Sequence, residues 1–165
     1  MRTPIVFYVT GTPKGQPRAR ARFGLRGVYD PGTADEWKKL VRGELMNAWD
    51  RVVFTGPVSL SLFFFFPRPK SHFAKKDGLA FCIRDSAPNW NPSRPDADNA
   101  SKAVMDAMSA RRMNPSDKGA RKIKAALFAL GVWKDDSQVC RLLVEKRYAG
   151  FGMSPGVMIE IKELE

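Results

Sequence analysis

The stretch Val58-Ser59-Leu60-Ser61-Leu62-Phe63-Phe64-Phe65-Phe66 decides the fold of this chain. It begins with alternating apolar and polar residues, ends in four consecutive phenylalanines, and follows Pro57 directly. This pattern predicts a β-strand that becomes apolar on both faces toward its end. Such a strand must be covered on both faces. We expect helices to cover one face, and a partner subunit or a long loop to cover the other.

The flanking sequence predicts further strands and helices around this strand. Residues 5–10 are β-branched and aromatic, which favours a strand. Thr33 and Glu36 have the spacing of a capping box and predict a helix over 33–50. Further helices are expected over 97–112 and over 117–130, where Ser116 would be the N-cap and Gly131 the stop, and strands over 139–148 and 157–163. This order predicts a single α/β (α+β) domain over residues 1–165, with a mixed sheet of about four strands packed with helices.

The charge balance of the chain is strongly positive. Its 165 residues include 28 Lys and Arg against 17 Asp and Glu, a formal net charge of +11. Such a charge indicates partners and says little about fold. Nucleic acid is the favoured partner, because neutralising phosphates releases condensed counterions. The alternative is a set of solvated lysines in a protein from a basic proteome.

The cysteines and the apolar runs bear on the cellular compartment. Cys82 and Cys140 are far apart, and neither has a neighbour at metal-ligand spacing. We therefore expect free thiols in a reducing, cytoplasmic compartment of a bacterial or phage-infected cell. No secretory segment is expected at the start of the chain, and no apolar run approaches the roughly 20 residues that span a bilayer.

Two segments gather carboxylates within this basic chain: 94–102 (RPDADNASK) and 133–138 (WKDDSQ). The first opens the helix that is expected over 97–112. At about 100° per residue, one face of this helix is apolar and should pack in the core, through Ala100, Val104, Ala107 and Met108. The other face is a charged stripe of Asp98, Lys102 and Asp106. Asp96 lies just before this stripe, where its side chain can turn toward the same pocket.

Each of these acids also has an ordinary structural explanation. Asp96 fits an N-cap, the stripe fits a solvated face with i,i+4 ion pairs, and Asp135 with Asp136 fits a turn before a strand. Against these, carboxylates from a helix start and a strand start fit Mg²⁺, which takes one or more carboxylates plus waters and phosphate oxygens. The single histidine, His72, cannot supply a histidine-based metal site.

These residues carry a resemblance to a known family. The pattern Asp96-x-Asp98-Asn99 with Lys102, followed by 131–139 (GVWKDDSQV), resembles the RusA family of Holliday-junction resolvases (crossover junction endodeoxyribonucleases). The resemblance covers about residues 88–148. Members of this family are often encoded by phages and prophages.

The resemblance implies a homodimeric endonuclease of RusA-like fold that needs Mg²⁺ or Mn²⁺ and resolves four-way DNA junctions in recombination and repair. It implies catalytic roles for Asp96, Asp98, Lys102 and Asp136, and metal binding by Asp96, Asp98, Asp135 and Asp136. Asp106 also matches an acid of the family. One departure is a basic amphipathic segment over 111–130, inserted before the second motif. Beside a nuclease site we expect this segment to contact phosphate, although such segments also bind membranes or partner proteins.

We therefore expect phosphodiester hydrolysis. Asp96, Asp98 and Asp136 would hold one or two Mg²⁺ ions, which lower the pKa of bound water and stabilise the attacking and leaving oxygens. Lys102 would offset negative charge on the scissile phosphate. Two such sites on a two-fold dimer would cut two strands of a junction symmetrically. The expected DNA contacts are Lys14, Arg18, Arg20, Arg22, Lys75, Lys76, Arg121 and Lys122.

Two other functions fit the same residues. One is a non-catalytic DNA-binding protein, in which the aspartates serve as caps and ion-pair partners. Trp90 and Trp133 would then be candidates to stack on exposed bases, although buried packing is expected for Trp133. The other is a nuclease for flaps or other branched DNA, without preference for four-way junctions.

Overall fold

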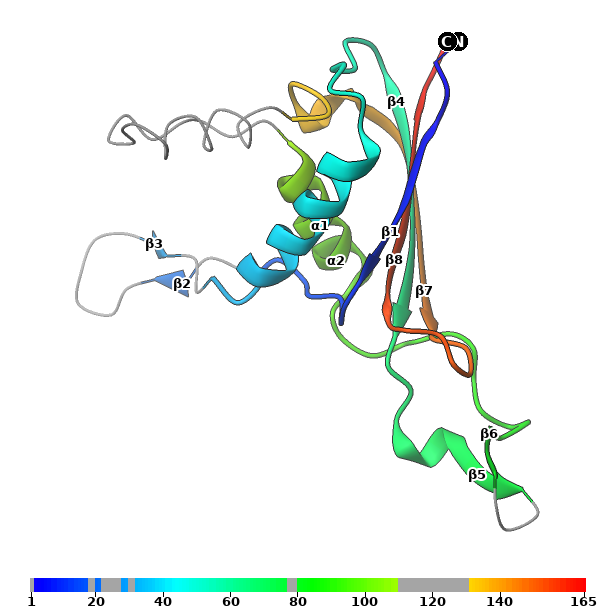
Figure 1. Cartoon of the computed structure of the whole chain (residues 1–165). Helices are drawn as coiled ribbons and strands as arrows, with labels where there is room; N and C mark the ends of the chain where they lie inside the picture. The colour runs from blue at the N-terminus through cyan, green and yellow to red at the C-terminus, as the bar shows by residue number, and fades with distance from the viewer. Residues whose placement is uncertain (1, 18–19, 22–27, 30–31, 77–79, 110–130) are drawn as a thin grey trace.

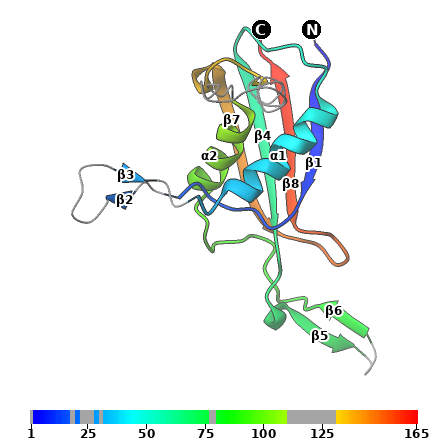
Figure 2. The ribbon, with the colours of Figure 1, turned by 60° about the vertical axis from the view of Figure 1, so that its left-hand side comes forward.

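The computed structural model describes residues 2–17, 20–21, 28–29, 32–76, 80–109 and 131–165. Its centre is a four-stranded sheet with the strand order β1-β8-β4-β7. β4 pairs in parallel with β7, and the other pairings are antiparallel, so the sheet is mixed as predicted. Two helices cover one face of this sheet (Figures 1 and 2). The core elements are β1 (Ile5–Thr10), α1 (Asp35–Ala48), β4 (Val58–Phe66), α2 (Ala97–Met108), β7 (Val139–Tyr148) and β8 (Gly156–Glu163).

β4 is a central strand, as its sequence predicts. It lies between β8 and β7 and pairs with both along its length. On the helix side, Leu60, Leu62 and Phe64 are fully buried in the hydrophobic core. Phe63 and Phe65 alternate onto the other face, where they are half-buried. The strand and its bounds are therefore confirmed.

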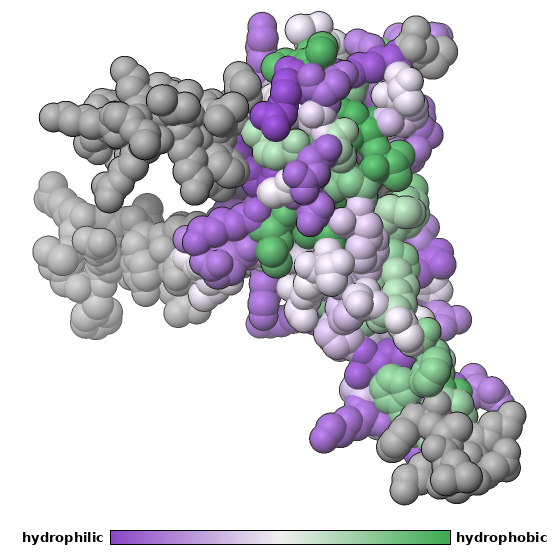
Figure 3. Space-filling model, in the orientation of Figure 1, coloured by the Kyte–Doolittle hydropathy of each residue, from purple (hydrophilic) through white to green (hydrophobic). Residues whose placement is uncertain are grey.

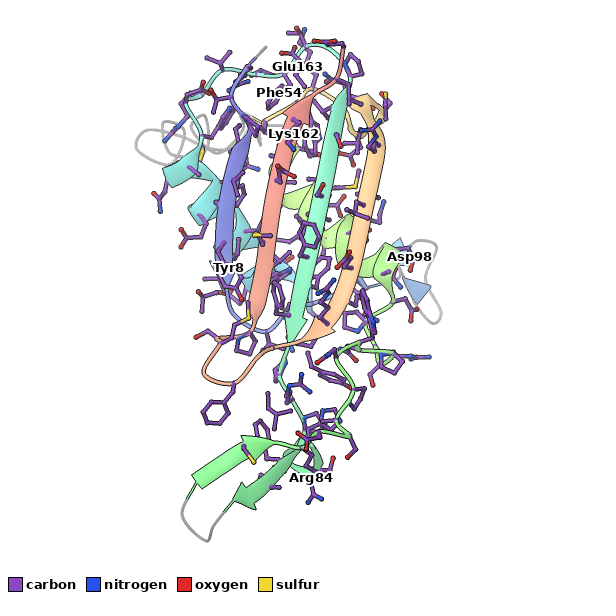
Figure 4. The ribbon with its side chains drawn as sticks, turned by 90° about the vertical axis from the view of Figure 1, so that its right-hand side faces the viewer. Tyr8, Phe54, Arg84, Asp98, Lys162 and Glu163 are labelled. Carbon is purple, nitrogen blue, oxygen red and sulfur yellow. The ribbon has the colours of Figure 1, made fainter. Side chains whose placement is uncertain are left out.

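The helix-free face of the sheet is partly closed by its own side chains (Figure 4). Tyr8 and Phe65 pack there, with ring centroids 6.3 Å apart. Val6, Leu143 and Met158 alternate onto the same face and are exposed. The second cover that the sequence assigns to a partner subunit or a loop stays a prediction.

α2 packs on the sheet through the face predicted from its sequence. The four expected core residues, Ala100, Val104, Ala107 and Met108, are all fully buried. Arg42 of α1 is also buried, and its Nη1 donates to the Ala107 and Ser109 carbonyl oxygens at 2.5 and 3.3 Å. A positive charge at the C-terminal end of a helix is stabilised by the helix dipole. Arg42 thus joins the two helices and caps the carbonyl end of α2.

The helix boundaries differ from the prediction in two respects. The capping box at α1 is wrong: Ala34 is the N-cap residue, and no side chain caps the helix. Thr33 lies one residue too early to accept a hydrogen bond from the first turn. α2 ends at Met108 because Ser109 adopts an extended conformation. The helix expected over 117–130, like residues 110–112, lies outside the described residues.

A hairpin protrudes from the end of the sheet at which β4 finishes (Figure 1). It consists of β5 (Phe73–Lys76) and β6 (Ala80–Ile83), preceded by the short 3₁₀ helix η1 (Lys70–His72). On the face shown in Figure 3 it carries both hydrophobic and hydrophilic residues. Arg68 fixes its base, because Nε donates to the Ala149 carbonyl at 2.8 Å and Nη1 donates to the Pro88 carbonyl at 2.9 Å. The hairpin is therefore an arm that is anchored at its base.

Two further strands lie between β1 and α1 along the chain. β2 (Arg20–Ala21) pairs with β3 (Val28–Tyr29) in antiparallel fashion. Both are two residues long, and they form a sheet separate from the main one.

Both ends of the chain lie at the end of the main sheet that is farthest from the β5–β6 hairpin (Figure 1). β1 begins there and β8 ends there, because the two strands are antiparallel neighbours with Ile5 opposite Ile161. Within the described ranges, no helix is long and apolar enough to cross a membrane. Cys82 and Cys140 are free thiols, as expected.

Two glycines offer a matched test of this packing. A Cβ at Gly156 would lie 2.3 Å from the Val9 carbonyl oxygen, whereas a Cβ at Gly43 in α1 would meet nothing within 4 Å. We expect Gly156→Ala to lower the free energy of unfolding by about 1–3 kcal/mol through overpacking. Gly43→Ala should raise it by about 0.5–1 kcal/mol through helix propensity. Urea unfolding measures both changes, and equal effects at the two sites would contradict the β1–β8 contact.

Candidate active site

A cleft of about 1050 Å³ opens at the end of the sheet where β4 finishes. Three segments form it: residues 12–17 after β1, residues 66–69 after β4, and residues 91–99 around the start of α2. Its described lining includes three cations and one carboxylate, namely Lys14, Arg68, Arg94 and Asp96. The cleft is therefore cationic, with an acid at the start of α2.

A close backbone approach joins two of the cleft walls. The Gln16 N–H donates to the Asn99 carbonyl at 2.8 Å. A Cβ at Gly15 would lie only 2.7 Å from the Pro95 Cβ, so a side chain at this position would push the walls apart. Gly15 thus lets the segment after β1 lie directly on the first turn of α2.

Asp96 and Asp98 stand at the start of α2 with exposed side chains. Asp96 is the N-cap residue but makes no side-chain cap hydrogen bond, so the structure does not use it as the cap. Neither carboxylate forms a hydrogen bond or ion pair with another residue of the described ranges. Lys102, exposed and one turn further along α2, follows Asp98 at i,i+4 on the same face. These three side chains are therefore available to a ligand.

Asp136 and Asp106, in contrast, are engaged within the fold. Asp136 Oδ1 accepts hydrogen bonds from Trp133 Nε1 at 3.0 Å and from the Ser109 hydroxyl. Trp133 is fully buried, as expected, so Asp136 ties the turn before β7 to the C-terminal end of α2. Asp106 forms a half-buried ion pair with Lys38 of α1, with 3.4 Å between Oδ2 and Nζ. Asp106 therefore joins the two helices.

α2 separates the two acidic groups. Asp98 lies in its first turn and Ser109 directly follows its end, so at 1.5 Å per residue they are about 16 Å apart along the helix axis. Among the described residues, no group of three or more His, Cys, Asp or Glu is placed to hold a metal ion. Within one chain, the expected convergence of Asp96 and Asp98 with Asp135 and Asp136 therefore does not occur. The helix length is the physical reason.

The carboxylates at the start of α2 still fit one type of Mg²⁺ site. In nucleotide and nucleic-acid sites Mg²⁺ keeps several waters and is held by one or two carboxylates together with substrate phosphates. Asp96 and Asp98 supply two carboxylates beside a cationic cleft. A site built from protein carboxylates alone does not fit this chain in its described part.

Asp135 serves as an N-cap. Its side chain accepts a hydrogen bond from the Ser137 N–H at 2.8 Å, and Gln138 completes a capping box around the 3₁₀ helix η2 (Asp136–Gln138). Hydrogen bonding from Ser137 holds the pKa of Asp135 below its ordinary value. The Gln138 amide also donates to the Phe54 and Gly56 carbonyls, each at 3.0 Å. Asp135 is thus part of a turn that fixes the start of β7, as its structural alternative proposed.

The expected DNA contacts are placed unequally. Lys14 lines the cleft. Arg20 lies on β2, and Lys75 and Lys76 lie on β5. Arg18, Arg22, Arg121 and Lys122 lie outside the described residues. Arg68 and Arg94 also line the cleft and were not among the contacts expected from the sequence, although Arg94 immediately precedes the acidic motif.

Comparison with known proteins now bears on this geometry. Residues 10–128 match the model of the family described as endodeoxyribonuclease RusA. The chain belongs to the RusA family. The match begins at the end of β1 and takes in most of the cleft, including the start of α2. Membership suggests a Holliday-junction endodeoxyribonuclease, and nucleases of this family are generally Mg²⁺-dependent.

A curated relative of this RusA-family protein is similar over nearly its whole length. It is the uncharacterized protein YqaN of Bacillus subtilis (strain 168), with 29% identity over 164 residues. The alignment covers 97% of this chain and 96% of the relative. The two proteins thus match in extent, and the name of the relative adds no function.

The cationic cleft makes a prediction about salt dependence. Lys14→Ala and Arg94→Ala should each weaken DNA binding and make the slope of log K against log salt less steep by about one, because each removes one phosphate contact. Fluorescence anisotropy with a labelled duplex between low and moderate salt measures the slope. Lys39→Ala is the control, since Lys39 is exposed on α1 and pairs with Glu36. Equal slopes for all four proteins would contradict the cleft as the DNA-binding surface.

Proposed function

We propose that this RusA-family chain is a Mg²⁺-dependent endodeoxyribonuclease that hydrolyses phosphodiester bonds in branched DNA, above all in four-way junctions of recombination and repair. The observation that carries the proposal is the pair of unbonded carboxylates, Asp96 and Asp98, at the start of α2 beside a cationic cleft. Isolated acids facing a polyanion would repel it. They make physical sense where a divalent cation lies between them and the phosphate.

Each residue at this end of α2 has a role in the proposal. Asp96 and Asp98 would hold Mg²⁺, or Mn²⁺ in its place, and the bound ion would lower the pKa of a water and stabilise the oxygens of the displacement. Lys102 places a positive charge one turn from Asp98 and would offset charge that develops on the scissile phosphate. Lys14 and Arg94 would hold the DNA backbone across the cleft.

Asp136 enters the proposal through a second copy of the chain. Its carboxylate lies at the opposite end of α2 from Asp98, so one chain does not bring the two together. A two-fold axis near Lys102, at the middle of α2, would place Asp136 of each copy beside Asp98 of the other. A homodimer of this kind has two equivalent sites and would cut two strands of a junction symmetrically. A contact through the helix-free face of the sheet would not do so, because both helices lie on the other side (Figure 2).

Asp98→Asn tests the metal-binding role. We expect cleavage of a four-way junction in Mg²⁺ to fall by at least about 100-fold, because one carboxylate is lost, while junction binding stays equal or tightens. Asp35→Asn is the matched control, since Asp35 is an exposed acid in the first turn of α1. Gel-based cleavage and binding assays provide both measurements. Cleavage by Asp98→Asn at the control rate would refute the assignment.

Mixed dimers test the shared site. Asp98→Asn and Asp136→Asn should each be inactive alone, and mixing them after denaturation and refolding should restore nicking of one strand. In the mixed dimer one site carries both substitutions and the other carries neither. If each site is contained in a single chain, every site in the mixture has one defect and no activity returns. Asp136→Asn keeps a side-chain oxygen for Trp133 and Ser109, so we expect its unfolding free energy to fall by only about 1 kcal/mol.

The substrate comparison separates the remaining possibilities. A four-way junction, a flap and a linear duplex are incubated with the protein in Mg²⁺ and in EDTA. We expect cleavage in Mg²⁺ and none in EDTA. The four-way junction should be cut faster than the flap or the linear duplex. Preferential cutting of the flap would identify a flap nuclease, and DNA binding without cutting in any metal would identify a non-catalytic DNA-binding protein.

A further inference from the structure

Trp90 differs from the other three tryptophans of the chain in being exposed. Trp37, Trp49 and Trp133 are buried, with at most 4% of their surface accessible, whereas Trp90 is 57% exposed. An indole has a large apolar surface, so leaving it in water forgoes a substantial gain in free energy. The exposure of Trp90 therefore calls for a ligand or partner.

The Trp90 indole is held in place before any ligand arrives. Trp90 and Arg147 form an antiparallel bridge at the outer edge of β7. The Asn91 N–H donates to the Lys146 carbonyl at 3.0 Å, and the Tyr148 N–H donates to the Asn89 carbonyl at 2.8 Å. These bonds flank a pair whose side chains lie close together on one face of the sheet. The segment is thus fixed as a short extra strand.

Arg147 lies over the indole, yet Trp90 stays largely exposed. The centre of its guanidinium lies 4.6 Å from the ring centroid, within the range of a cation–π contact. Trp90 is 57% exposed despite this contact, and among the described residues no second ring or cation contacts the indole. Arg147 also pairs with Glu145 at 2.6 Å, which fixes the guanidinium. The indole is therefore a rigid flat platform.

The platform adjoins the cationic cleft. Asn91, the residue after Trp90, lines the cleft, as do Ser93 and Arg94. Lys146 donates from Nζ to the Ser93 carbonyl at 2.6 Å and so ties the same segment to β7. Asp96, the proposed metal ligand, is six residues from Trp90 along this fixed segment. The indole itself lies with Arg147 and Phe65 on the helix-free side of the sheet, at the outer edge of β7, so a polynucleotide in the cleft would reach it by passing around this edge.

We propose that Trp90 is a stacking site for one unpaired nucleobase of the bound DNA. The inference rests on the proposed function, since it requires DNA in the cleft, and it adds the recognition of an unstacked base at the neighbouring edge of β7. Every base has a flat π face, so an indole backed by an arginine binds any of the four. Bases at a branch point, a bulge or a flap are free to leave the DNA double helix. Bases in a continuous duplex are already stacked on one another. Trp90 therefore favours branched over linear DNA without reading sequence.

Charge favours a nucleic acid over a protein partner at this position. Arg147 lies over the indole, and Glu145, the acid on the same face of β7, is already paired to Arg147. The segment that follows Trp90 lines a cleft with three cations and one acid among its described residues. Phosphates on either side of a stacked base would meet these cations.

Tryptophan fluorescence tests the proposal directly, because the other three indoles are buried. The protein is titrated in EDTA, which prevents cleavage, with a duplex that carries two unpaired thymines and with a matched continuous duplex. We expect the bulged duplex to quench the emission and to protect it from acrylamide. Trp90→Phe should remove the quenched component. Equal quenching by both duplexes, or quenching that survives in Trp90→Phe, would overturn the proposal.

Binding measurements give a second, independent readout. The ratio of affinities for the bulged and continuous duplexes should fall by about 5- to 100-fold in Trp90→Ala, the range expected for loss of one base–aromatic stack. Trp90→Phe should keep most of the ratio, because phenylalanine also stacks. Phe151→Ala is the matched control, since Phe151 is an exposed aromatic in the β7–β8 turn, and it should leave the ratio unchanged. Chemical unfolding of each variant verifies that it folds.

The outcomes separate this proposal from the proposed nuclease. An unaltered protein that binds neither duplex would overturn both. An unaltered protein that binds and cuts, with the same affinity ratio in Trp90→Ala, would overturn the stacking site alone. A change of oligomeric state in Trp90→Ala, measured by sedimentation, would assign the indole to a contact between copies and would also overturn it.

Discussion

Burial of the helix-facing side of β4 is the interaction on which the rest of this molecule depends. Leu60, Leu62 and Phe64 are fully buried in one core with α1 and α2, and the strand pairs with both of its neighbours. Because β4 ends beside the start of α2, this packing sets three chain segments around one cleft. The same arrangement places the arm that follows β4, with Arg68 at its base, next to the cleft. The packing of the core therefore positions the segments of the candidate site, which does not depend on loop geometry alone.

α2 has two distinct functions in the protein. It buries an apolar face, and it acts as a spacer between two acidic groups. At its start the carboxylates are unbonded, whereas at its end Asp136 is held by Trp133 and Ser109, and Asp106 by Lys38. The engaged acids stabilise the fold, and the unbonded acids supply charge without a partner in the described part of the chain. The distinction between them is one of hydrogen bonding, since all four belong to closely spaced sequence motifs.

Sequence patterns predicted the main elements and the core face of α2, because periodicity reports burial directly. β1 and β4 have the bounds that their apolar runs indicate, and Ala100 to Met108 pack as their spacing requires. The distance between Asp98 and Asp136 was missed, because motif spacing does not show to which end of a helix the chain returns. The capping box failed by one residue at Ala34. Burial was expected for Trp133 but not for Trp90, and the structure buries Trp133 and leaves Trp90 exposed.

The position of the chain ends has a practical consequence. β1 begins and β8 ends at the end of the sheet that is remote from the β5–β6 hairpin. Both termini therefore lie away from the cleft (Figure 1). A fluorophore, an affinity tag or a fused carrier attached at either terminus would sit on the far side of the molecule from the polynucleotide. The molecule can accordingly be immobilised or labelled through its ends while the nucleic-acid side remains open.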